Sequence, residues 1–216
     1  MKFNLKKEWP LLILLVIPVI AAVFLYPHMP DQVPIHWNIN GEVDNYGSRL
    51  FGTFFLPILN LFLYAMFLIM PTFDPKRVNY SKFESSYNVI RYSIHLLFLF
   101  LFVVTAAAAL GYDVNIGKWV PAGICIMFII FGNIMGRVRH NYFVGFKFPW
   151  TLANEEVWKK THQAGAKAMV LGGIGALIGV LVTKGTLSFI LMMAGIFIPV
   201  AFITVYSYLL YRNLEK

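Results

Sequence analysis

Charged residues and cysteine are scarce in this sequence. Only 13% of its 216 residues are Asp, Glu, Lys or Arg, against about 25% in a soluble domain, and 59% are hydrophobic. With a mean hydropathy of +0.68, the chain has too little polar surface to enclose its apolar side chains in water. This excludes a soluble enzyme and a disordered regulator. Cys125 is the only cysteine, so an intramolecular disulfide and a multi-cysteine metal site are excluded too. The composition indicates a membrane protein.

Motifs for catalysis and metal binding are also lacking. No Ser-His-Asp, Cys-His or His-Glu-x-x-His arrangement supplies a nucleophile, so we expect a protein that is not an enzyme and needs no cofactor. One loop holds the residue types that bind metals: His28, Asp31, His36, Glu42 and Asp44. Their spacing matches no known site, so we predict no metal centre.

Long apolar runs without charge fill about half of the chain. They are residues 11–26, 50–70, 93–110, 119–135, 168–182 and 187–211. A helix needs about 20 apolar residues to cross a bilayer, and the two shortest runs have amphipathic extensions. We therefore predict an all-α membrane protein with six transmembrane helices. No Asp, Glu, Lys or Arg lies deep in a run, which disfavours a proton-coupled pump.

A few polar residues and glycines interrupt these runs. Asn60 should form an interhelical hydrogen bond worth about 1 kcal/mol, and His95 should be a packed, hydrogen-bonded histidine. Gly175 and Gly179 form a G-x-x-x-G pair in the fifth run, which favours close helix packing.

The placement of basic residues predicts the orientation in the membrane. Fifteen of the 18 Lys and Arg residues lie in the N-terminus, in the 71–92 and 136–167 connections, and in the C-terminus. The other three are Arg49, Lys118 and Lys184. Because cytoplasmic segments are enriched in Lys and Arg, both termini should be cytoplasmic in a bacterial multi-pass membrane protein. The net charge of +8 is thus a topology signal, and no nucleic-acid partner is needed to explain it.

The connection over residues 27–49 is too long and too distinctive to be a simple turn. Three prolines restrict its backbone, and its Asn, Asp and Gly residues favour turns. His36, Trp37 and Tyr46 form an aromatic cluster, which argues against disorder. We predict a structured extracytoplasmic loop that rests on the bilayer interface or receives a ligand.

The connection over residues 136–163 is the second distinctive loop. Its part from Asn141 to Trp150 is aromatic-rich and not a simple helix, because Gly145 and Pro149 interrupt it. Asn154 should then cap a helix that continues into the fifth span. Anchoring to the membrane interface and docking of a partner explain the aromatic residues of this cytoplasmic loop equally well.

Two segments resemble a known family. MPDQVPIHWNINGEVDNYGSR (residues 29–49) and GNIMGRVRHNYFVGFKFPWTLANEEVWKKTH (residues 132–162) are similar to motifs of the SdpI/YfhL family of bacterial integral membrane immunity proteins. Lys147 stands where an Arg is common. The resemblance implies a two-helix unit over residues 1–70, with the extracytoplasmic motif loop, and an SdpI-like four-helix unit over residues 71–216.

The resemblance also implies a function. Such a protein protects its producer against a secreted, membrane-active toxin peptide. In the family's best-known member, the protein also relays the presence of the toxin by recruiting a helix-turn-helix autorepressor to the cytoplasmic face, and a similar relay is an open part of the expected function. The expected toxin-binding residues are His36, Trp37, Asn38, Gly41, Asp44, Tyr46 and Arg49. The expected partner-docking residues are Asn141, Tyr142, Gly145, Lys147, Pro149, Trp150, Thr151, Trp158, Thr161 and His162.

Two other functions stay open at this point. Each motif loop follows the first helix of a three-helix half, one loop outside and one inside, which is the opposed topology of inverted-repeat transporters. A small transporter or flippase for a peptide or lipid is therefore the alternative. An enzyme within the membrane would need a deep polar cavity that gathers His36, Asp44 and Arg49.

Overall fold

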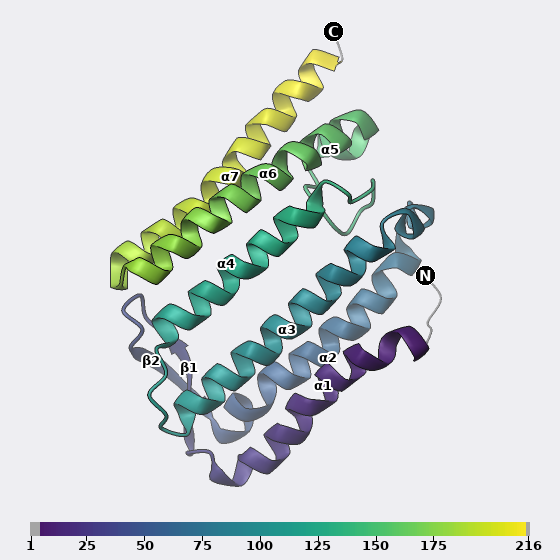
Figure 1. Ribbon diagram of the computed structural model, residues 1–216. Coiled ribbons are helices and arrows are strands. Elements are labelled where there is room, and N and C mark those ends of the chain that lie inside the picture. The colour runs from purple at the N-terminus through teal and green to yellow at the C-terminus, as the bar shows by residue number, and fades with distance from the viewer. Residues whose placement is uncertain (1–4, 215–216) are drawn as a thin grey trace.

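The computed structural model describes residues 5–214 and is mostly helical (Figure 1). Its α-helices are α1 (Leu5–Leu25), α2 (Arg49–Phe73), α3 (Glu84–Ala109), α4 (Ile116–Met135), α5 (Pro149–Ala153), α6 (Glu155–Val182) and α7 (Gly185–Leu214). The remaining secondary structure of residues 5–214 consists of two strands, β1 (Gln32–Trp37) and β2 (Val43–Ser48), and two short 3-10 helices, η1 (Tyr26–His28) and η2 (Arg77–Lys82).

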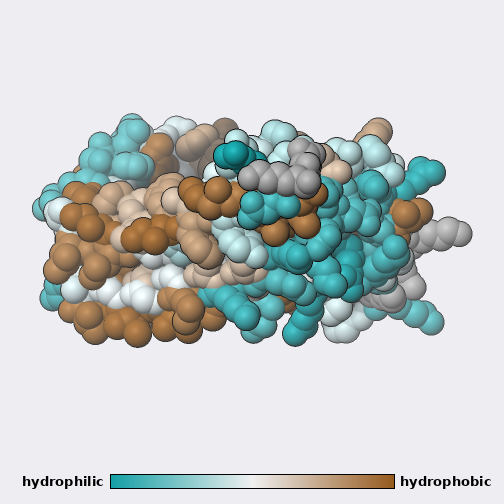
Figure 2. Space-filling model, turned by 90° about the horizontal axis from the view of Figure 1, so that it is seen from above, coloured by the Kyte–Doolittle hydropathy of each residue, from teal (hydrophilic) through white to brown (hydrophobic). Residues whose placement is uncertain are grey.

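Six of these helices are long and apolar enough to cross a membrane, as the charge-free runs predicted. They are α1, α2, α3, α4, α6 and α7, and they lie roughly alongside one another in Figure 1. Figure 2 shows one face of the molecule, on which hydrophobic residues cover much of one half and hydrophilic residues gather on the other. The chain is a multi-pass membrane protein.

The β1–β2 hairpin and the segment 136–154 lie at opposite ends of the bundle (Figure 1). We call the end with the two strands the hairpin end and the end with residues 136–154 the loop end. Along the chain the long helices form two groups of three: α1, α2 and α3, then α4, α6 and α7. The hairpin follows the first helix of the first group, and the segment 136–154 follows the first helix of the second group.

Close backbone approach holds α4, α6 and α7 together. A Cβ on Gly132 of α4 would lie 2.8 Å from Cβ of Met169, and one on Gly179 of α6 would lie 2.7 Å from Cβ of Leu191. Only glycine allows these approaches. The G-x-x-x-G expectation is half right, because Gly175 has no atom within 4 Å of an added Cβ and so makes no such contact.

The helices α1, α2 and α3 are joined by buried polar side chains instead. Arg91 of α3 binds Glu8 of α1 through both carboxylate oxygens, at 2.9 and 2.5 Å, and Tyr64 of α2 donates to Glu8 at 3.1 Å. About one turn along α2 and α3 from Tyr64 and Arg91, the Asn60 and His95 side chains lie 2.6 Å apart. The expected interhelical hydrogen bond of Asn60 is thus present.

Candidate functional site

A β-hairpin occupies most of the connection 27–49, an element that the sequence analysis did not predict. β1 and β2 are antiparallel, with Val33 opposite Gly47 and Trp37 opposite Val43. The Asn38 side chain builds the turn, because its oxygen accepts the backbone N–H groups of Asn40 and Glu42 at 2.9 and 3.0 Å.

The hairpin is fixed to the bundle at its base. Arg49, the first residue of α2, binds the Asp31 carboxylate at 2.7 Å, and its backbone N–H donates to the Asp31 carbonyl. Val33 is buried and packs beside Gly52 of α2.

The tip of the hairpin rests on the other group of helices. Gly41 has a φ of +82°, and a Cβ on it would lie 3.2 Å from the backbone of Gly117 at the start of α4. The side-chain oxygen of Asn40 lies beside Gly185, where α7 begins. The hairpin therefore spans the end of the bundle as a supported platform.

Polar and aromatic side chains of the hairpin face the solvent. Nδ1 of His36 lies 2.5 Å from Asp44 across the strands, and the two side chains are 66% and 42% exposed. Tyr46 is exposed as well, whereas Trp37 is half-buried. Asn38 shapes the turn, Gly41 contacts α4 at the tip, and Arg49 holds the base through Asp31. Of the seven predicted ligand residues, some are thus exposed side chains, and others stabilise the structure of the hairpin.

Asn141 shapes the segment 136–154 at the loop end. Its side-chain oxygen accepts the N–H groups of Phe143 and Val144, and its amide donates to the carbonyls of Arg139 and Val144. One fully buried side chain thus meets four backbone hydrogen-bonding groups, which lets this irregular stretch of chain pack against the bundle with those groups paired.

Trp158 and His162 form the floor beneath this segment. Their rings stack with centroids 4.0 Å apart, and Trp158 donates to the Val138 carbonyl at 3.1 Å. His162 donates from Nδ1 to the Trp158 carbonyl and accepts the Phe146 N–H at Nε2, so it is a neutral imidazole with a fixed tautomer. Gly145 has a φ of +118° and lies directly against both rings.

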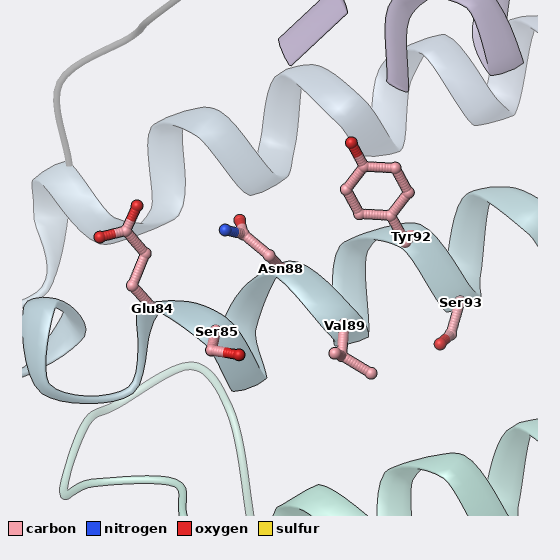
Figure 3. A pocket seen from close by; sticks show the side chains of 6 residues that line it. All are labelled: Glu84, Ser85, Asn88, Val89, Tyr92 and Ser93. Carbon is pink, nitrogen blue, oxygen red and sulfur yellow. The ribbon is translucent and has the colours of Figure 1, made fainter. Parts of the chain in front are cut away.

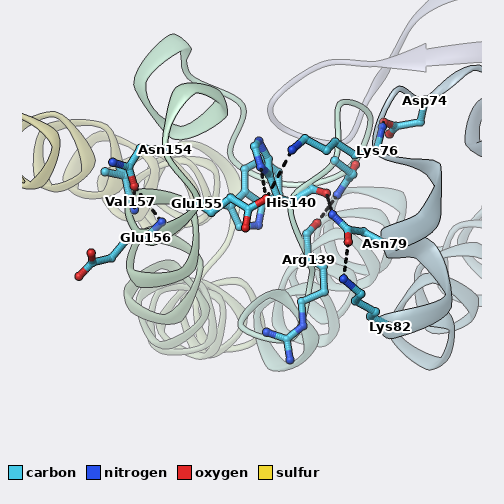
Figure 4. A network of polar contacts seen from close by, with 12 residues as sticks. Asp74, Lys76, Asn79, Lys82, Arg139, His140, Asn154, Glu155, Glu156 and Val157 are labelled. Atoms are coloured by element: carbon cyan, nitrogen blue, oxygen red, sulfur yellow. Dashed lines mark hydrogen bonds and ion pairs between the residues drawn. The ribbon is translucent and has the colours of Figure 1, made fainter.

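Contacts with η2 and its flanks attach the segment to the first three helices (Figure 4). The buried Asp74 carboxylate accepts the Tyr80 hydroxyl and the Tyr142 N–H, both at 2.9 Å. Burial and this carboxylate raise the pKa of Tyr80 well above its usual range, so the hydroxyl stays a donor. The Asn79 amide donates to the His140 carbonyl at 2.9 Å.

The predicted docking residues differ widely in exposure. Asn141, Thr151, Trp158, Thr161 and His162 are buried. Tyr142, Lys147 and Pro149 are exposed, while Gly145 and Trp150 lie between these extremes. Trp150 donates to Ser207 of α7 at 2.8 Å. Solvent therefore reaches only part of the predicted docking set, and the buried members pack beneath the exposed ones.

The sequence analysis did not single out Glu8 and Arg91. They flank the first and third charge-free runs, and only the packing of α1 on α3 brings them together. The sequence does hold one signal of this ion pair, because the two opposite charges stand at the same end of two predicted spans. Among residues 5–214, no group of three His, Cys, Asp or Glu side chains is placed to hold a metal ion.

Comparisons with known proteins agree with these two segments. Residues 13–61 match a domain of unknown function, DUF1648, and residues 137–207 match the SdpI/YfhL protein family. The chain is 28% identical over 212 residues to the immunity protein SdpI of Bacillus subtilis (strain 168), covering 98% of this chain and 99% of that protein. No solved structure matches. The resemblance to the SdpI/YfhL family, which the two loops indicated, is confirmed.

Proposed function

We propose that this protein is a membrane immunity protein that binds a secreted, hydrophobic toxin peptide at its hairpin. The similarity to an immunity protein along nearly the full length of both chains carries the proposal. In this arrangement the hairpin end faces outward and the loop end, with both termini, faces the cytoplasm, in accord with the basic residues of the connections.

The exposed face of the hairpin is suited to capture. His36, Asp44 and Tyr46 present a hydrogen-bonding pair beside an aromatic ring, and the hairpin is supported at its base and at its tip. A preorganised surface loses little conformational entropy when a peptide binds. No catalytic step is part of this role.

A relay to the cytoplasm is the second part of the proposal. α4 begins under the hairpin tip at Gly117 and leads directly into the segment 136–154, so one helix connects the two sites. Toxin binding would favour a state with a shifted α4, in which Tyr142, Lys147 and Pro149 hold a helix-turn-helix repressor. This requires two states that differ in affinity for the toxin.

A survival assay tests the immunity role. The chain is expressed in a sensitive strain, which is challenged with secreted hydrophobic antimicrobial peptides. The wild type should protect against at least one, and His36→Gln with Tyr46→Ala should not, at equal membrane levels. Tyr112→Ala, an exposed tyrosine at the same end but outside the hairpin, is the matched control. Full protection by the hairpin variant would overturn the binding surface.

A reporter driven by the candidate repressor tests the relay separately. Tyr142→Ala or Lys147→Gln should abolish toxin-induced expression and leave survival unchanged. Loss of both readouts would indicate a folding defect and contradict a dedicated docking surface.

A transporter or flippase is the alternative, favoured by the opposed placement of the two motif segments in the two three-helix groups. Uptake of a labelled toxin decides between the two. A binding protein retains peptide at the cell surface, whereas a transporter changes the amount inside in an energy-dependent way.

A further inference from the structure

Two bridges join the three-helix groups, one at each end of the bundle. The hairpin is fixed to α2 at its base and rests on α4 at its tip, where Gly41 meets Gly117. At the other end, the segment 136–154 continues α4 and binds the first group of helices. A shift of one group against the other therefore changes the contacts of both bridges.

The polar contacts that tie the loop end to the first group come from η2 and its flanks. Buried side chains of Asp74 and Asn79 hold the backbone of the segment 136–154, as described above. Lys76 instead lies 3.4 Å from the Glu155 carboxylate at the start of α6, and these two side chains are 40% and 70% exposed. Because water and salt compete for exposed charges, the Lys76–Glu155 pair is the contact that opens at the lowest cost.

The Glu155 carboxylate also contacts the segment itself. Its Oε1 lies 3.5 Å from Nδ1 of His140, and Figure 4 shows it between His140 and Lys76, whereas Glu156 points away. The His140 side chain is 7% exposed, and its ring packs on Trp158 with centroids 5.0 Å apart. Nε2 of this ring is buried and has no hydrogen-bond partner in the described part of the chain. Loss of the Glu155 contact therefore leaves a buried imidazole unpaired, which favours release of the segment into water.

Packing on one face of α3 does not oppose such a release. An open groove of about 610 Å³ runs along the first turns of this helix (Figure 3). Its six lining residues, from Glu84 to Ser93, all belong to α3. No residue of the segment 136–154 lines the groove, so this face of α3 does not hold the segment in place.

We propose that Glu155 is a latch, whose contacts with Lys76 and His140 keep the segment 136–154 closed while the hairpin is empty. This inference rests on the relay of the proposed function and names the contact that regulates it. When toxin shifts the two groups, Lys76 leaves Glu155 and His140 loses its partner. The segment then opens, and the exposed side chains around Tyr142 reorient toward the repressor.

The latch is weak enough for a ligand at the other end to open it. An exposed ion pair such as Lys76–Glu155 favours the closed state by at most about fivefold. A toxin that binds the open state about tenfold more tightly than the closed state outweighs this pair.

Hydrogen–deuterium exchange of the purified full chain in detergent tests the latch without toxin or partner. Lys76→Gln removes the exposed pair and should speed exchange of the amides of residues 139–144 by up to about fivefold. Glu155→Ala also removes the contact with the segment and should speed it by at least about tenfold. Glu156→Ala is the matched control, because Glu156 follows directly in α6 and its ion pair is with Lys160 of the same helix. Exchange in this control should equal that of the wild type.

Unchanged exchange in Lys76→Gln and Glu155→Ala, or an equal acceleration in Glu156→Ala, would overturn the latch. Exchange in α7 should stay at the wild-type rate, which separates local opening from general unfolding. A charge swap gives a second test: Lys76→Glu and Glu155→Lys should each speed exchange, and the two together should restore slow exchange at least in part. A swapped protein as fast as the single reversals would contradict the pairing.

The reporter of the proposed relay separates failure of the latch from failure of the function. In cells without toxin, Glu155→Ala should raise reporter expression above that of Glu156→Ala, with survival under toxin unchanged in both. If the wild type never responds to toxin, the proposed relay is wrong, and the exchange rates still decide on the latch. A responsive wild type with equal uninduced expression in the two variants would overturn the latch.

Discussion

The hairpin end and the loop end both use His and Trp side chains, yet they place these residues differently. At the hairpin end, His36 and Asp44 pair in solvent. At the loop end, Trp158 and His162 stack with almost no exposure. The same residue types therefore supply an accessible surface in one region and an internal scaffold in the other. Substitutions should affect function directly at the hairpin and stability first at the loop end.

The largest stability effect is expected at Trp158. Trp158→Ala removes a buried ring, its stacking on His162 and its hydrogen bond to Val138, at a cost of about 3–5 kcal/mol. Thermal unfolding in detergent and the level of protein in the membrane should both fall. Trp37→Ala, on the half-buried hairpin tryptophan, should cost less. Equal losses from the two variants would remove the distinction between the regions.

Asp74→Asn should have the next largest effect. The buried carboxylate accepts the Tyr80 hydroxyl and the N–H groups of Lys76 and Tyr142, and the amide cannot accept all three, so we expect a loss of about 2–3 kcal/mol. Asp113→Asn, at an exposed acid of the hairpin end, is the control and should leave the unfolding midpoint unchanged. An Asp74→Asn protein as stable as this control would mean that the link between η2 and the loop contributes little.

Gly145→Ala tests the contact between the loop and its floor. The substitution strains a φ of +118° and brings a methyl group against His162, which together should cost about 2 kcal/mol. Gly111→Ala isolates the backbone contribution, because Gly111 has a φ of +88° but no atom within 4 Å of the new Cβ. Chemical or thermal unfolding should rank the two variants in this order. The reverse ranking would contradict tight packing of the loop.

His36→Ala should have the smallest effect on stability. An exposed pair such as His36–Asp44 contributes less than about 1 kcal/mol, so the unfolding midpoint and the membrane level should stay close to those of the wild type. Survival in the presence of toxin should nevertheless fall. A variant that loses its fold instead would show that the pair is part of the scaffold.

Much of the helical architecture could be predicted from composition. The charge-free runs located all six long helices, and Asn154 indeed caps α6 through the N–H groups of Glu156 and Val157, so that the helix continues into the fifth span. Hydrophobicity and capping are local properties, which is why a single sequence reveals them.

Contacts between distant segments could not be predicted in the same way. In β1, Val33, Ile35 and Trp37 do alternate with other residues, but Pro34 argues against a strand and β2 shows no such alternation. The pairing also depends on a turn built by Asn38. Glu8 and Arg91 are 83 residues apart, and nothing local indicates that they meet. Which loop residues are buried also depends on the packing of α6 beneath them.

The central claim is that the exposed face of the hairpin contacts the toxin while the loop end maintains the fold. Survival of toxin-challenged cells, normalised to membrane protein level, tests it most directly in the variant that combines His36→Gln and Tyr46→Ala, with Tyr112→Ala as control. We predict a normal membrane level with lost protection in the hairpin variant and full protection in the control. Full protection in both, or equal loss in both, would contradict the account.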